Sequence, residues 1–290
     1  MSKIALGTVQ FGLDYGIANC SGQVEYAGIE QILFEAKKNG ICILDTAIAY
    51  GTSEETLGKV GVDGFRVVTK LSSLPEDQGD VAGWVRGQVE ASLDRLGQEK
   101  LYGLLLHRPQ DLLGSNGTQL IQVLADLKND GFVRKIGVSI YTMDELDEVC
   151  KQFKIDLVQA PLNVIDRRME ATGWLDRLKD DDVEIHTRSA FLQGLLLMER
   201  ARIPPKFSRW SKLWDEWHEK LKVEETSALS ASLAYPLSLD QVDQVIVGVD
   251  NASQLQEILK VAKNGSKGPC TSFMSSTDLD LINPTNWNNL

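Results

Sequence analysis

The sequence predicts a single (β/α)8 TIM barrel that spans residues 1–290, and three observations lead to this prediction. Short apolar segments alternate with longer segments of helical periodicity almost from end to end, as expected for repeated βα units around a parallel sheet. Eight of the apolar segments qualify as strands, which is the number that closes such a barrel. The length of 290 residues also suits one barrel, because this architecture commonly takes roughly 250 residues.

The predicted strands are short runs rich in Ile, Val and Leu, the composition of strands that are covered on both faces. In chain order they are residues 4–6, 41–44, 65–69, 101–106, 135–138, 157–160, 184–187 and 245–247. A doubly wound open sheet is the competing arrangement, but that fold usually carries a Gly-x-Gly-x-x-Gly turn after its first strand. The sequence has no such turn there, so we favour the barrel.

Between the strands, apolar residues recur three and four positions apart, which predicts amphipathic helices. The clearest examples are residues 27–39, 82–96, 119–129, 143–153, 170–179 and 252–260. Gly40, Gly97 and Gly131 come just after three of these segments, where a glycine favours a left-handed C-terminal cap. The sequence therefore marks where these helices end.

Two segments depart from the alternation. Residues 195–239 contain Pro204-Pro205 and three tryptophans on one face of a predicted helix, so we expect an insertion whose tryptophans pack against the barrel. Residues 265–290 are rich in Ser, Thr, Asn and Pro, and we expect an irregular C-terminal tail that drapes over a barrel end.

Composition argues against several classes of protein. The formal net charge of −11 and the pI near 4.9 oppose attraction to nucleic acid or to anionic membrane surfaces. The N-terminus has no apolar stretch of signal-peptide length, and no segment approaches the ~20 apolar residues of a membrane helix, so we expect a cytoplasmic protein. The four cysteines and three histidines show no metal-ligand spacing, and we expect neither a metal site nor a disulfide.

Four ionisable residues follow three consecutive predicted strands. Asp45 ends the second strand and Tyr50 follows it in the loop, while Lys70 and His107 come directly after the third and fourth strands. The carboxyl ends of barrel strands all meet at the face that holds the active site. Singly, each residue has a structural explanation, such as a turn cap or a strand-end charge. Together they predict a catalytic pocket.

The chemistry of the four groups is complementary. A free tyrosine has a pKa of about 10, and a cation such as Lys70 lowers that pKa by favouring the phenolate. Asp45 holds Lys70 charged and oriented, and His107 positions a substrate oxygen while Tyr50 supplies the proton. We therefore expect hydride transfer to a carbonyl, with the hydride arriving from the other side.

These residues resemble the Asp, Tyr, Lys and His tetrad of the aldo-keto reductase superfamily, in the same chain order. Further segments are similar to the opening loop, fifth strand and sixth strand of that family: Gly7-Thr8-x-x-Phe11-Gly12, Gly131-x-x-Arg134-Lys135-x-Gly137-x-Ser139 and Gln159-x-x-x-Asn163. The resemblance covers residues 3 to 262. It implies an NAD(P)H-dependent oxidoreductase in which Asp45, Tyr50, Lys70 and His107 are catalytic.

The resemblance also implies a nicotinamide site. Ser139 and Gln159 are similar to the residues that hydrogen-bond the nicotinamide carboxamide, and residues 189–195 resemble a segment that binds pyrophosphate. The cofactor-binding residues that we expect are Ser139, Gln159, Arg188, Ser189, Phe191, Gln193, Gly248, Asp250, Gln254 and Glu257.

Two positions and one segment depart from the family pattern. Ile140 stands where an Asn usually follows the fifth-strand serine, and Arg188 replaces an aromatic residue that stacks on the nicotinamide. The guanidinium of Arg188 could stack there or bind an anionic group. Residues 248–257 contain no Lys or Arg, and the carboxylate of Asp250 would repel a 2′-phosphate, so we expect NAD or dual use unless Lys260 or Lys263 reaches the site.

The expected partner is a small polar carbonyl compound, with a sugar or sugar derivative as one candidate, and we expect a monomer or homodimer. A nicotinamide-binding regulatory subunit with little turnover is the alternative from another class, since potassium-channel β subunits resemble this family. A non-redox barrel such as a lyase or isomerase is a third alternative. The complete tetrad favours the enzyme over both.

Overall fold

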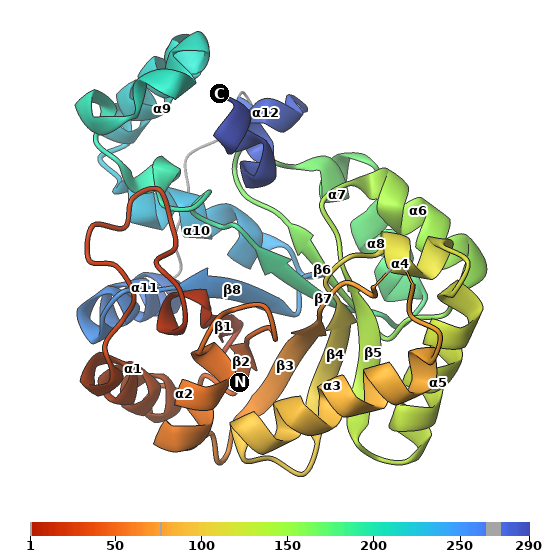
Figure 1. The fold of residues 1–290 in the computed structure, drawn as a ribbon. Helices are drawn as coiled ribbons and strands as arrows, with labels where there is room; N and C mark the ends of the chain where they lie inside the picture. Colours follow the sequence, from red (N-terminus) through yellow and green to blue (C-terminus); the bar gives the residue numbers. More distant parts are fainter. Residues whose placement is uncertain (1, 76, 265–273) are drawn as a thin grey trace.

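Eight parallel strands form a closed ring in the order β1 to β8, as Figure 1 shows for the computed structural model. The structure describes residues 2–75, 77–264 and 274–290. The strands are β1 (Ile4–Gly7), β2 (Ile43–Asp45), β3 (Arg66–Leu71), β4 (Leu101–Leu106), β5 (Val133–Ser139), β6 (Leu157–Pro161), β7 (Glu184–Arg188) and β8 (Gln244–Gly248). The predicted TIM barrel is confirmed, and each strand lies where the apolar runs predict it.

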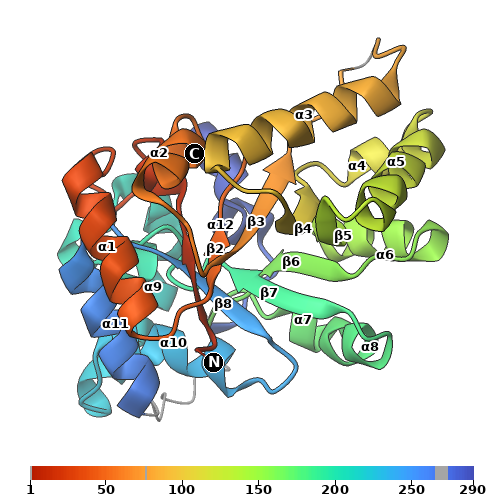
Figure 2. The same cartoon turned by 90° about the horizontal axis from the view of Figure 1, so that it is seen from below.

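Helices surround the strand ring, and the view from below in Figure 2 shows them on its outside. The longer ones are α1 (Tyr26–Lys38), α2 (Ser53–Val60), α3 (Val81–Leu96), α5 (Gly117–Asn129), α6 (Met143–Gln152), α8 (Trp174–Asp180), α9 (Ser211–Val223), α10 (Ala228–Ser238) and α11 (Ala252–Asn264). Shorter turns are η1 (Val9–Phe11), α4 (Gln110–Leu113), α7 (Arg168–Ala171), η2 (Leu195–Leu197), η3 (Arg200–Arg202), η4 (Pro205–Trp210), α12 (Leu279–Ile282) and η6 (Pro284–Asn289).

Local sequence accounts for several helix ends. The Asp80 side chain accepts a hydrogen bond from Gly83 N at 2.8 Å at the start of α3, and Gly97 ends that helix with φ of 61°. Gly40 and Gly131 also have positive φ, as predicted. The predicted helix 170–179 is instead two helices, because Gly173 takes φ of 76° between α7 and α8.

The barrel interior is filled beneath the carboxyl ends of the strands. A separate apolar cluster there comes from inward-facing residues of six strands: Ala5, Ile43, Val68, Leu105, Leu157 and Ile246, of which Ile246 borders the cavity. Because successive strand residues face opposite sides, the alternate positions pack outward against the helices. The packed floor leaves the carboxyl ends of the strands as the place for a cavity.

The departures from the alternation are more regular than the sequence suggests. Within residues 195–239, α10 packs against α11 as the outer helix of the seventh βα unit, so the added segment is residues 195–223. In the predicted tail, residues 265–273 lie outside the described residues, whereas residues 279–289 form α12 and η6. The expectation of an irregular tail is therefore corrected for that part.

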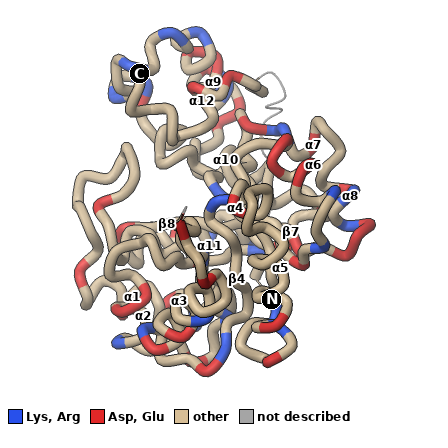
Figure 3. Tube along the Cα trace, turned by 45° about the vertical axis from the view of Figure 1, so that its right-hand side comes forward, with Lys and Arg blue, Asp and Glu red and all other residues tan. Residues whose placement is uncertain are grey.

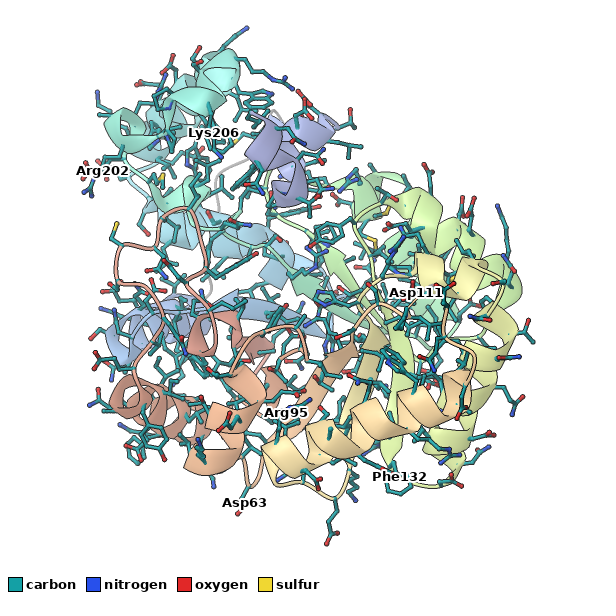
Figure 4. All side chains as sticks on the ribbon, in the orientation of Figure 1. Asp63, Arg95, Asp111, Phe132, Arg202 and Lys206 are labelled. Carbon is teal, nitrogen blue, oxygen red and sulfur yellow. The ribbon has the colours of Figure 1, made fainter. Side chains whose placement is uncertain are left out.

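The added segment and the tail pack on each other. The indoles of Trp214 and Trp217 are buried, and they donate hydrogen bonds to carbonyls of the same segment, Phe207 O at 3.2 Å and Leu196 O at 3.1 Å. Trp287 of the tail meets the Phe207 ring edge-on at 4.9 Å. In Figure 4, the added segment, which carries the labels Arg202 and Lys206, lies far from Asp63 and Phe132 at the amino ends of β3 and β5.

Charges of both signs are mixed along the outer helices, as Figure 3 shows. Among the helices of the described residues, none is both long and apolar enough to cross a membrane. Cys20, Cys42 and Cys150 are free cysteines, and Cys270 lies outside the described residues. In the same described part of the chain, no group of three His, Cys, Asp or Glu side chains is arranged to hold a metal ion.

Candidate active site

A cavity of about 610 Å³ lies at the carboxyl ends of the strands, and its volume is within the range of small-ligand sites. The loops after β1, β2, β4, β5, β7 and β8 contribute to its wall, and β6 contributes Gln159 from within the strand. All the site residues predicted from the sequence line this cavity, except for Lys70. The structure therefore brings the predicted catalytic and cofactor-binding residues into one place.

Lys70 lies directly behind the cavity wall, and its side chain is only 1% exposed. Its Nζ donates hydrogen bonds to Asp45 Oδ2 at 2.7 Å, to Thr46 O at 2.8 Å and to the Tyr50 hydroxyl at 3.4 Å. These three acceptors match the three N–H donors of an ammonium group. Lys70 therefore connects the Asp45 carboxylate to the phenol that faces the cavity.

The alternation of β3 places Lys70 inside the barrel. Val68 belongs to the inner cluster, and Lys70 follows it two positions later on the same face. Thr69 faces the other way and donates to Glu54 Oε1 of α2 at 2.6 Å. A shift of the strand by one residue would exchange these two environments.

Tyr50 lies in a tight turn between β2 and α2. Its backbone N–H donates to Ala47 O at 3.0 Å, and its own carbonyl accepts from Ser53 N at 3.0 Å. Gly12 of the opening loop packs against this turn so closely that a Cβ there would lie 1.8 Å from Tyr50 O. The glycine of the opening motif thus permits the contact that fixes the turn.

Burial raises the pKa of Tyr50 above its ordinary value, and the charge of Asp45 adds to that effect. This direction is opposite to the lowering predicted from Lys70, because the phenol lies in a desolvated site. Burial also lowers the pKa of Lys70, while its ion pair with Asp45 acts in the other direction. At neutral pH, Tyr50 is therefore a protonated phenol, which can act as a proton donor.

His107 lies against Tyr50, with the two rings edge-to-face and their centroids 5.9 Å apart. Burial lowers the pKa of His107 to about 4, and the charges of Lys70 and Arg188 contribute to the same direction. The imidazole is therefore neutral at pH 7. Its side chain makes no hydrogen bond to another described residue, so its ring nitrogens are available to a ligand in the cavity.

A chain of hydrogen bonds joins two of the expected cofactor residues, Ser139 and Gln159, to the four predicted catalytic residues. Ser139 Oγ donates to Gln159 Oε1 at 3.2 Å, and Gln159 Nε2 donates to Asp45 Oδ1 at 2.6 Å. Each oxygen of the Asp45 carboxylate therefore has its own partner, Gln159 on one side and Lys70 on the other. Ile140 is fully buried next to them and presents no polar side chain to the cavity.

The loop after β7 has an unusual backbone. Ser189, Leu192 and Gln193 have φ values of 64°, 49° and 53°, in the left-handed region that non-glycine residues seldom occupy. Asn163, from the loop after β6, donates from its side chain to Ser189 O at 3.0 Å. Such strain persists only where neighbouring structure enforces it, and it is common at ligand sites.

The loop after β8 carries acidic and amide side chains. Asp250 and Gln254 are joined twice, since Asp250 N donates to Gln254 Oε1 at 2.8 Å and Gln254 Nε2 donates to Asp250 Oδ2 at 3.3 Å. Neither Lys260 nor Lys263 is among the residues that line the cavity. Lys263 points toward α1 instead, where its Nζ donates to Asn39 Oδ1 at 2.8 Å.

Sequence reasoning missed several residues of the cavity wall, among them Gln10, Tyr15 and Tyr141. The Tyr15 hydroxyl accepts from Gln193 Nε2 at 3.1 Å, and burial raises its pKa to about 12. Tyr15 follows the opening glycine motif, and Tyr141 comes two positions after Ser139. Their proximity to the opening-loop motif and to Ser139 was the available signal, although sequence proximity does not show which way a loop side chain points.

The cavity fits a ligand rich in hydrogen-bonding groups. Gln10 Oε1 is buried and has no hydrogen-bond partner among the described residues, and Gln10 lies beside the backbone of Gly248. A Cβ at Gly248 would come 2.6 Å from the Gln10 amide, so the glycine keeps this part of the wall open. The Ser139–Gln159 pair supplies further polar groups of the kind that bind a carboxamide.

The closed parallel barrel and the polar cavity at its carboxyl ends define a TIM-barrel enzyme. The chain belongs to the aldo/keto reductase family, because residues 3–266 match the model of that family. It is therefore an oxidoreductase, and the nicotinamide cofactor is a property of that family.

Individual relatives are similar over most of their length. The chain is 26% identical to an NADH-specific methylglyoxal reductase of Escherichia coli, with 89% of this chain and 88% of that protein covered. It is 23% identical to the L-glyceraldehyde 3-phosphate reductase of Escherichia coli, with coverage of 80% and 78%. Among solved structures, the holo form of an aldo-keto reductase from Bacillus halodurans superposes with a TM-score of 0.73 at 20% identity, covering 94% of this chain and 89% of the other.

Proposed function

We propose that this protein is an NADH-dependent carbonyl reductase in which Tyr50 donates the proton to the carbonyl oxygen of a small polar substrate. One observation carries the proposal: Lys70 Nζ contacts both Asp45 Oδ2 and the Tyr50 hydroxyl, while Tyr50 and His107 face the same cavity. A proton donor, a cation that stabilises the anion left behind and a second hydrogen-bonding group thus surround one position.

The cofactor would lie against the wall formed by the carboxyl ends of β5 and β6 and the loops after β7 and β8. Ser139 and Gln159 would hold the nicotinamide carboxamide, while the loop from Ser189 to Gly194 and the loop after β8 would hold the rest. When bound, a reduced nicotinamide supplies the hydride to the carbonyl carbon. The mutual hydrogen bond of Ser139 and Gln159 supports this assignment, because it orients both side chains at the cavity wall.

The proton transfer is the task of the protein's own residues. The carbonyl oxygen accepts hydrogen bonds from the Tyr50 hydroxyl and the neutral His107 ring, and both groups face it from the cavity wall. As negative charge develops on that oxygen, the phenol proton moves to it and yields the alcohol. Lys70 stabilises the resulting phenolate, and Asp45 keeps the Lys70 ammonium in place.

NADH is the proposed cofactor because the loop after β8 lacks a cation for a 2′-phosphate. Asp250 and Glu257 both line the cavity, and their carboxylates would repel a phosphate dianion. Asp250 instead offers an acceptor to a ribose hydroxyl. The similarity to an NADH-specific reductase is consistent with this proposal.

The experiment combines binding with turnover. We expect NADH to quench the tryptophan fluorescence of the protein on titration and to be oxidised when aldehydes, ketoses or other small polar carbonyl compounds are added. Tight NADH binding without oxidation across that panel would favour a regulatory subunit. Absence of binding to NADH and NADPH would overturn the proposal entirely.

A further inference from the structure

Arg188 is the one Lys or Arg among the described residues that line the cavity, and it is the last residue of β7. Its guanidinium lies over the Tyr141 ring, with Cζ 4.1 Å from the ring centroid. Nη2 donates to Ile140 O at 2.8 Å, and Nη1 is 3.4 Å from Ser189 Oγ. The stacking and these bonds fix the guanidinium in one orientation.

The charge of Arg188 has no carboxylate partner among the described residues. The other cation at this site, Lys70, is paired with Asp45 at 2.7 Å, so Arg188 is the cation of the site that has no ion-pair partner among the described residues. A guanidinium has five N–H donors, and the two bonds above engage one each. Three N–H donors of Arg188 therefore have no hydrogen-bond partner among the described residues.

A purely structural role does not account for this arrangement. The bond to Ile140 O would connect the loop after β5 to the end of β7, but a neutral donor would serve that purpose without a charge in a partly buried site. The charge of Arg188 also reaches the reaction centre, because it is one of the causes, after burial and Lys70, that lower the pKa of His107 to about 4. An anion bound at Arg188 would lie within the same cavity as Tyr50 and His107.

We propose that Arg188 binds an anionic group of the substrate, so that the preferred substrates are small carbonyl compounds that carry a carboxylate or a phosphate. This inference rests on the proposed reductase function. Both groups present paired oxygens that match the fork of a guanidinium, and both gain more from a desolvated cation than from a solvated one. Tyr141 and Ser189 keep that fork from turning toward solvent.

The test compares carbonyl substrates that carry an anionic group with neutral counterparts that lack it. Glyoxylate and methylglyoxal form one pair, and glyceraldehyde 3-phosphate and glyceraldehyde form the other, so the two pairs distinguish a carboxylate from a phosphate. We expect kcat/KM to be at least tenfold higher for the anion in one pair. Arg188→Met should reduce that preference by roughly 10- to 100-fold, and Arg188→Lys should retain part of it.

Arg209→Met is the matched control. Arg209 also stacks over an aromatic ring, with Cζ 4.1 Å from the Trp210 centroid, but it lies outside the cavity and pairs with Asp278. This variant should leave the ratio of the two kcat/KM values unchanged. The ratio is the readout that a structural role of Arg188 would not alter, because destabilisation lowers both values together.

Three results would overturn the inference while the reductase function stands. The first is equal kcat/KM for the anionic and neutral members of both pairs in the wild type. The second is a preference for the anion that survives in Arg188→Met. The third is a rise in the Kd for NADH as the only effect of that variant, which would assign Arg188 to the cofactor. Failure of all four compounds to be reduced would instead contradict the proposed function itself.

Discussion

Two polar clusters lie on opposite faces of β3. Thr69 belongs to an outer cluster, on the side of the helices, and the adjacent Lys70 belongs to an inner cluster, inside the barrel. The outer cluster is closed: Glu54 accepts from Thr69 Oγ1 at 2.6 Å, from Ser92 Oγ at 2.5 Å and from Arg95 Nε and Nη2 at 2.9 and 2.7 Å. None of its members lines the cavity. It connects α2, α3 and β3, so its role is to hold helices to the strand.

The inner cluster consists of Lys70, Asp45, Tyr50 and His107. It also contains buried charged and polar groups, but some of them are accessible from the cavity. Lys70 and Asp45 are as buried as Glu54, but the Tyr50 hydroxyl and the His107 ring border the cavity. A polar cluster whose groups are all satisfied internally contributes to stability, whereas one that presents a group to a cavity is arranged for a ligand. The difference predicts that variants of the two clusters affect different properties.

Loss of Lys70 has the largest expected effect on activity. Lys70→Met removes the cation that stabilises the Tyr50 phenolate, so kcat should fall by about 10³-fold while the Kd for NADH stays within a few-fold. The variant Lys70→Met, Asp45→Asn removes both charges, which avoids an unpaired buried carboxylate. Steady-state kinetics of both variants test this, with Lys59→Met as control because Lys59 is an exposed lysine of α2. Retained kcat in the Lys70 variants would contradict the distinction between the two clusters.

The outer cluster should affect stability instead. Glu54→Ala leaves Arg95, Thr69 and Ser92 without their shared acceptor, and we expect a loss of about 3 kcal/mol in the free energy of unfolding in urea. Thr69→Val removes one hydrogen bond and should cost about 1 kcal/mol. Turnover per folded molecule should change by less than about threefold. A fall in kcat comparable to that of Lys70→Met would mean that the clusters are not distinct.

The pH dependence of stability sharpens the contrast. Because burial lowers the pKa of His107 from 6.5 to about 4, the unfolded chain binds the proton first as the pH falls. Protonation of His107 in the unfolded chain therefore lowers the free energy of unfolding progressively as the pH falls from 6.5 toward 4, and it has no effect well above pH 6.5. The urea midpoint of the wild type should therefore fall more between pH 7.5 and pH 5 than that of His107→Gln. Equal falls in the two proteins would contradict the assignment.

The smallest expected effect concerns the loop after β8. Asp250→Ser removes a carboxylate from the cavity wall, and the ratio of the Kd for NADPH to the Kd for NADH should fall by roughly three- to tenfold, as befits a partly solvated charge. Asp63→Ser is the control, because it removes a charge of the same sign at the opposite end of the barrel, where Figure 4 labels Asp63. Equal changes in the two variants would show only a general effect of net charge.

Much of the fold could be predicted because its strands are buried on both faces. Such strands are continuous apolar runs, and the predicted run 101–106 coincides with β4 (Leu101–Leu106). The end of each strand then placed Asp45, Lys70 and His107 at one face by topology alone. Their catalytic roles remain predictions.

Features that depend on contacts between distant segments were not predictable. The stacking of Arg188 on Tyr141 joins the end of β7 to the loop after β5, and no local pattern specifies it. The direction of the pKa shift of Tyr50 was predicted wrongly because burial, which the sequence does not show, outweighs the nearby charge. The helix break at Gly173 shows the same limit, since an isolated glycine within a periodic segment does not by itself end a helix.

The central claim is that Tyr50 delivers the proton inside the cavity, and Tyr50→Phe tests it most directly. The substitution removes one hydroxyl and keeps the ring that packs against His107. With a carbonyl substrate that the wild type reduces, kcat should fall by two orders of magnitude or more while NADH still binds with a similar Kd. Turnover equal to that of the wild type would remove Tyr50 from its proposed role and contradict the account.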